Sequence, residues 1–135
     1  MMKLFFCIFS CLAISLSQSE LPSRYHTYEE IVDSLFHWNS LFSENNSPSQ
    51  YYPGSGVIYQ MEEIGTTGTD NLPIYAVKLS YNANQEIDKP KVLILGQCHA
   101  EEILGVEVSM EMIRRFLYPG NYLNDFQTLM GVLYY

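Results

Sequence analysis

Between residues 27 and 42 the apolar residues recur every three or four positions, which predicts an amphipathic helix. They are Tyr28, Ile31, Val32, Leu35, Trp38 and Phe42. Thr27 and Glu30 have the spacing of a capping box, with Thr27 as the N-cap and Glu30 reaching back to it. Ser43–Gly56 is then dense in turn-forming residues, so we expect a surface loop there.

Four later segments have the composition of β-strands. Val57–Glu63 and Ile74–Tyr81 flank the turn-rich stretch Gly65–Pro73, which predicts an antiparallel pair. Lys91–Gly96 is apolar at four consecutive positions, which is typical of a strand covered on both faces in an α/β sheet. We expect it to be the central strand. Leu129–Tyr135 is predicted to be a further strand.

A second helix is predicted after the central strand, because apolar residues again recur at spacings of three and four. They are Ile103, Val106, Met110, Ile113 and Leu117. Glu101 and Glu102 precede the positive end of this helix, and Arg114 and Arg115 lie near its negative end, as the helix dipole favours. The whole pattern predicts an α/β fold with a mixed central sheet flanked by helices.

The first residues are typical of a secretory leader. Lys3 precedes a short apolar run, Leu4–Leu16, and small residues follow it near Ser19. The run is too short for a membrane span, so we predict residues 1–19 to be a signal peptide and the protein to be secreted or periplasmic. A lipoprotein anchored through Cys11 is the alternative that the sequence leaves open.

Composition narrows the function classes. The chain has 135 residues, of which 47% are hydrophobic and 16% charged, as in a globular domain. Its formal net charge is −8, and −9 without Lys3, which argues against binding to nucleic acid or to an anionic membrane. Without the leader Cys98 is the remaining cysteine, so no internal disulfide is expected.

His99 and Glu102 follow the predicted central strand directly. Ligands of open α/β sheets bind at the carboxyl ends of the strands, and residues three apart in a first helical turn lie on the same side. An imidazole and a carboxylate there are suited to zinc, although catalytic zinc sites have three protein ligands. The spacing alone is also compatible with an ordinary histidine beside a helix N-terminus.

Several ordered blocks make the chain similar to the zinc carboxypeptidases of the carboxypeptidase A type. The blocks are Tyr25–Ile31, Glu63–Gly68, Leu72–Ser80 and Lys89–Glu102, the last resembling the family's G-x-H-A-R-E segment. The resemblance implies an enzyme that uses Zn2+ to release C-terminal amino acids from peptides. It also implies that His99 and Glu102 are two of the three zinc ligands.

The family's third ligand and its general base are expected beyond Tyr135. The resemblance therefore predicts that residues 20–135 are the N-terminal portion of a catalytic domain, with no catalytic residue of its own and no activity alone. Glu101 stands where the family often has arginine, which bears on the substrate that is accepted. The residue preferred at the cleaved end and the oligomeric state are left open.

Two other functions remain open. One is a related zinc amidohydrolase of the succinylglutamate desuccinylase or aspartoacylase type, and the other is a non-catalytic secreted binding module. Among the other candidate donors, His26 and His37 are expected to be surface or partly packed residues, and Cys98 is expected to be a buried thiol rather than a ligand. Glu107 is predicted to be a solvated helix residue.

Overall fold

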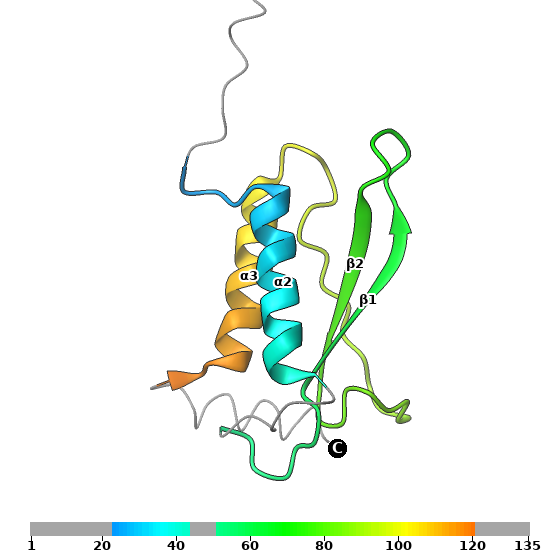
Figure 1. Ribbon diagram of the computed structural model, residues 1–135, viewed down its shortest axis with the longest axis vertical. Coiled ribbons are helices and arrows are strands. Elements are labelled where there is room, and N and C mark those ends of the chain that lie inside the picture. Colours follow the sequence, from blue (N-terminus) through cyan, green and yellow to red (C-terminus); the bar gives the residue numbers. More distant parts are fainter. Residues whose placement is uncertain (1–22, 44–50, 121–135) are drawn as a thin grey trace, which may run out of the picture.

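The computed structural model describes residues 23–43 and 51–120. Its elements are α2 (Tyr28–Phe42), β1 (Tyr59–Thr66), β2 (Pro73–Leu79) and α3 (Ile103–Leu117). Figure 1 shows α2 and α3 side by side, running in the same direction, with the β1–β2 hairpin standing beside them. The predicted leader and the predicted strand Leu129–Tyr135 lie outside the described residues. Within the described ranges, no helix is long and apolar enough to cross a membrane.

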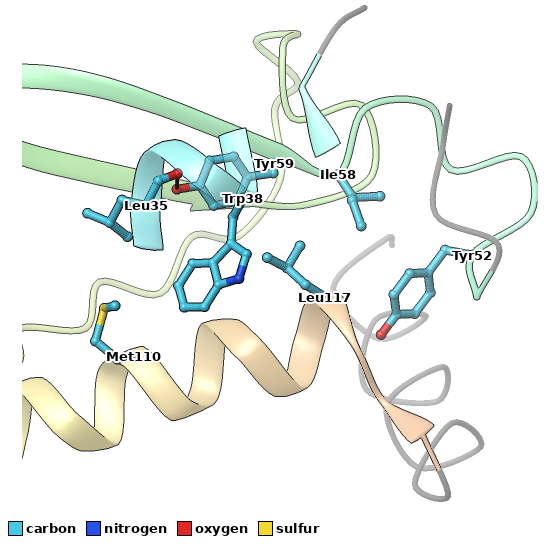
Figure 2. Close-up of a cluster of buried hydrophobic side chains, with 7 residues drawn as sticks. All are labelled: Leu35, Trp38, Tyr52, Ile58, Tyr59, Met110 and Leu117. Atoms are coloured by element: carbon cyan, nitrogen blue, oxygen red, sulfur yellow. Dashed lines mark hydrogen bonds between the residues drawn. The ribbon is translucent and has the colours of Figure 1, made fainter. Parts of the chain in front are cut away.

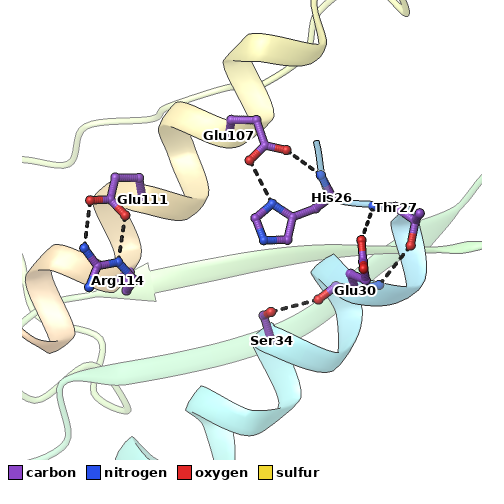
Figure 3. Close-up of polar contacts among 7 residues, drawn as sticks. All are labelled: His26, Thr27, Glu30, Ser34, Glu107, Glu111 and Arg114. Atoms are coloured by element: carbon purple, nitrogen blue, oxygen red, sulfur yellow. Dashed lines mark hydrogen bonds and ion pairs between the residues drawn. The ribbon is translucent and has the colours of Figure 1, made fainter. Parts of the chain in front are cut away.

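Helix α2 begins at the predicted capping box. The Glu30 amide donates to Thr27 Oγ1 at 3.3 Å, and the Thr27 amide donates to Glu30 Oε2 at 2.8 Å (Figure 3). These two bonds satisfy amides that have no partner inside the helix. The apolar stripe of the helix buries Leu35 and Trp38, as its spacing predicts.

Strands β1 and β2 confirm the predicted antiparallel pair, with boundaries shifted by a few residues. Their register joins Tyr59 to Leu79 at one end and Thr66 to Pro73 at the other, with an irregularity between Glu63 and Gly65. The connection between them is closed by two hydrogen bonds between Thr67 and Leu72. One joins the Thr67 amide to the Leu72 carbonyl at 2.8 Å, and the other joins the Leu72 amide to Thr67 Oγ1 at 3.0 Å.

A small hydrophobic core joins the helices to the hairpin, and we call it the packed core (Figure 2). Its residues are Leu35, Trp38, Tyr52, Ile58, Tyr59, Met110 and Leu117. Tyrosine hydroxyls tie its elements together: Tyr59 donates to the Leu35 carbonyl at 3.0 Å, and Tyr52 to the Phe116 carbonyl at 2.9 Å. The loop before β1 is thus partly internal, because Tyr52 is 1% exposed, whereas a surface loop was predicted.

The predicted central strand is wrong for the described part of the chain. Residues 91–96 form no strand, and the described sheet has two antiparallel strands. Two helices beside this small sheet are compatible with part of an α/β fold. Val92 is 74% and Leu93 is 82% exposed, so neither face of this segment is covered. A strand of this type requires a hydrogen-bonded neighbour and a covering layer on each face, and the described residues provide neither.

Candidate metal centre

The predicted ligands His99 and Glu102 lie in the loop that leads into α3, the yellow stretch of Figure 1. The Glu102 amide donates to the His99 carbonyl at 3.0 Å, and the Gly105 amide donates to the Glu102 carbonyl at 3.0 Å. Gln97 Nε2 donates to the Ala100 carbonyl at 2.6 Å. These local bonds turn the chain back on itself and bring His99 and Glu102 together.

The side chains of His99 and Glu102 face each other. His99 Nδ1 lies 3.0 Å from Glu102 Oε1. Glu102 is the N-cap residue of α3, but its carboxylate makes no cap hydrogen bond to the helix. The structure thus places the two side chains close together, as predicted. The Glu102 carboxylate contacts the His99 imidazole and not the amides at the start of α3.

The separation of the two side chains is suitable for two ligands of one zinc ion. Two ligands of one tetrahedral zinc ion, at bond lengths of about 2.0–2.1 Å, lie about 3.3 Å apart, close to the observed 3.0 Å. The His99 side chain is 69% and the Glu102 side chain 53% exposed, so a ligand reaches them without any opening of the fold. The described residues contain no group of three histidine, cysteine or acidic side chains able to hold a metal.

The other candidate donors are placed elsewhere by the structure. His37 is exposed on α2, and His26 contacts Glu107 instead of the loop pair. Cys98 is a free, exposed cysteine, so the prediction of a buried thiol is wrong. That prediction depended on the preceding segment being a covered strand, and the segment is open to solvent instead.

His26 and Glu107 form a contact that the sequence did not indicate (Figure 3). The His26 amide donates to Glu107 Oε1 at 2.7 Å, and its Nδ1 lies 2.8 Å from Oε2. Hydrogen bonding from the His26 amide is the main cause that holds the pKa of the Glu107 carboxyl below its usual value. The prediction that Glu107 is a solvated residue is wrong, because its side chain is 20% exposed and holds the segment before α2 against α3.

A model of the zinc carboxypeptidase family matches residues 50–128. The chain belongs to the zinc carboxypeptidase family. Searches among curated proteins and among solved structures gave no match.

The matched range of this zinc carboxypeptidase family member includes His99 and Glu102, the hairpin and α3. The block Tyr25–Ile31, which also carried the resemblance, lies before that range. Membership implies peptide hydrolysis and zinc use at the level of the family. The roles of His99 and Glu102 in this chain stay predictions.

Proposed function

We propose that this chain takes part in zinc-dependent hydrolysis of peptides at their C-terminal end, with His99 and Glu102 as two of the zinc ligands. The observation that carries the proposal is the 3.0 Å approach of His99 Nδ1 to Glu102 Oε1, within the range matched by the family model. When bound, zinc polarises a water molecule and the scissile carbonyl group.

The residues of the loop have separate tasks in this proposal. His99 would hold the metal through Nδ1, and Glu102 would hold it through Oε1 and offset part of its charge. Their exposure leaves room for a peptide end to approach. Glu107 is not the general base, because both of its oxygens are hydrogen-bonded to His26.

A third donor and a general base are still required. The described residues offer no third donor beside the loop pair. We therefore expect the chain by itself to bind zinc more weakly than a three-ligand site and to release no amino acid from a peptide. A non-catalytic binding module, the second candidate, is supported by this same incomplete donor set.

The test is a zinc titration of the chain and of four variants. His99→Ala and Glu102→Ala each remove one donor, and we expect each to abolish measurable zinc binding because a single donor does not hold the ion. His37→Ala and Glu101→Ala are matched controls, since each removes the same side-chain type from an exposed position. Zinc binding that survives both loop variants, or no binding by the unmodified chain, would contradict the proposed ligand pair.

A further inference from the structure

Two glycines meet where residues 91–96, which we call the exposed segment, reach α3. A Cβ atom at Gly105 would overlap with the carbonyl oxygen of Gly96 and would lie 2.7 Å from its carbonyl carbon. A Cβ atom at Gly96 would lie 2.9 Å from Ser109 Oγ and 3.2 Å from Val106 Cα. Neither glycine has a left-handed backbone, so space and not conformation requires glycine at both positions.

Gly105 is also a residue of low helix propensity within its own helix. It is the third residue of α3, and a glycine inside a helix costs about 1 kcal/mol relative to alanine. A close approach of another backbone is a usual reason to find glycine at such a position. Here the approaching backbone is that of Gly96.

The contact between Gly96 and Gly105 closes the loop that carries the proposed ligands. His99 and Glu102 lie between the two glycines in sequence. Every side chain from Gln97 to Glu102 is exposed, so burial of side chains does not hold this loop in place. Its remaining supports are the local hydrogen bonds within the loop.

We infer that Gly96 and Gly105 are positioning residues, which hold the loop so that His99 and Glu102 face one another. For the role of this pair as metal ligands, the inference rests on the proposed function. The glycine contact itself acts on the loop whether or not a metal is present. A side chain at Gly105 forces the exposed segment away from α3, because its Cβ atom would overlap with the Gly96 carbonyl. The loop then loses one of its two fixed ends.

The variants are Gly105→Ala and Gly96→Ala, with Gly68→Ala as the matched control. A Cβ atom at Gly68 would meet no atom within 4 Å, so this control changes the residue type without a steric consequence. The first measurement is hydrogen exchange at the Glu102 amide, which is bonded to the His99 carbonyl. We expect Gly105→Ala to speed this exchange at least about tenfold, with amides of α2 and β1 unchanged.

The second measurement is the zinc dissociation constant of the same full chains. We expect Gly105→Ala to weaken zinc binding about tenfold or more, which is the usual effect of losing a group that orients a ligand. Gly96→Ala should have a smaller effect, and Ser109→Ala should partly restore it by removing the nearest atom. Ser109→Ala should not restore Gly105→Ala, whose obstacle is backbone.

The outcomes separate the two proposals. Unchanged exchange at Glu102 in Gly105→Ala, or equal acceleration at amides throughout the chain, would overturn the inference. Faster exchange at Glu102 with unchanged zinc binding would also overturn it, because the loop would then not position the ligands. Failure of the unmodified chain to bind zinc would sink the proposed function alone, since exchange at Glu102 reports the glycine contact without metal.

Discussion

The β1–β2 hairpin and the exposed segment, residues 91–96, have similar strand-forming sequences and different structures. In the hairpin each strand has a hydrogen-bonded partner, and Tyr59 at its start is fully buried. In the exposed segment Leu93 is 82% exposed, and no strand of the described residues pairs with it. Strand composition therefore shows that a segment is able to form a strand. Pairing and covering by other segments determine whether it forms one.

The hairpin obtains its partner locally. Its two strands are separated by a short connection, so closing the pair costs little chain entropy, and Thr67 and Leu72 fix the turn. The exposed segment follows Asn82–Pro90, a polar stretch with no strand. A partner strand for the exposed segment would have to be distant from it in sequence. No local sequence pattern identifies such a partner.

The largest expected difference between the two regions is in the free energy of unfolding. Tyr59→Ala removes a fully buried side chain and should cost about 3–5 kcal/mol. Leu93→Ala should change the free energy of unfolding by less than about 0.5 kcal/mol, because little of that side chain is buried. Urea unfolding followed by circular dichroism measures both.

Tyr59→Phe keeps the ring and tests the same region if the alanine variant does not fold. It removes only the hydroxyl that donates to the Leu35 carbonyl, at a cost of about 1 kcal/mol. A cost for Leu93→Ala comparable to that of Tyr59→Phe would show that the exposed segment is covered in solution, and the comparison would then be wrong.

A second, smaller expected effect is the loss of stability of the packed core at alkaline pH. Burial is the main cause that raises the pKa of Tyr52 to about 12, with the neighbouring Tyr81 as a further cause. Because the folded-state pKa is raised, the neutral hydroxyl contributes stability below pH 10, and this contribution is lost as the pH rises towards about 12. The loss should be about 2–3 kcal/mol.

Tyr52→Phe isolates that contribution. The variant loses the bond to the Phe116 carbonyl and is less stable at pH 7, but its unfolding midpoint should fall less between pH 10 and 12 than that of the unmodified chain. Burial also raises the pKa of Tyr59, so both chains retain some alkaline loss, and the difference between them belongs to Tyr52. If the unfolding midpoints of the two chains fall equally between pH 10 and 12, Tyr52 does not lie in the packed core.

Much of the local structure was predictable because its causes are local. Thr27 and Glu30 form the predicted capping box, and the apolar spacing of α3 identified Met110 and Leu117, which are buried. The proximity of His99 and Glu102 was also predictable, since they are three positions apart in the sequence.

The features that sequence reasoning missed depend on contacts between distant residues. The His26–Glu107 pair joins residues 81 positions apart, and neither residue type is unusual where it stands. Gly105 did carry a signal, as a glycine inside an apolar helical pattern, but Gly96 could be identified as its partner only from the fold. The predicted central strand failed for the same reason, because its burial depended on elements that the described residues do not supply.

The smallest expected effects come from comparing the ion pairs of Glu111 on α3 with the His99–Glu102 pair in the loop. Glu111 contacts Arg114 and Arg115 at 2.7 Å each, and these hydrogen bonds lower the pKa of Glu111 to about 2. A lowered folded-state pKa stabilises the fold above the usual carboxyl pKa, and this stability is lost as the pH falls towards about 2. Glu111→Gln should therefore cost no more than about 1 kcal/mol at pH 7, because all three side chains are about half exposed, and the cost should shrink in acid.

Glu102→Gln provides the comparison from the loop. Its partner His99 is mostly exposed, so we expect a change within about 0.5 kcal/mol in the free energy of unfolding at pH 7. Urea unfolding of both variants at pH 7, and of Glu111→Gln down to pH 2, decides the matter. If Glu102→Gln costs more than Glu111→Gln, the loop pair is a stabilising contact of the fold. If it costs nothing, the approach of His99 to Glu102 is not explained by stability, which is the outcome expected for the proposed ligand pair.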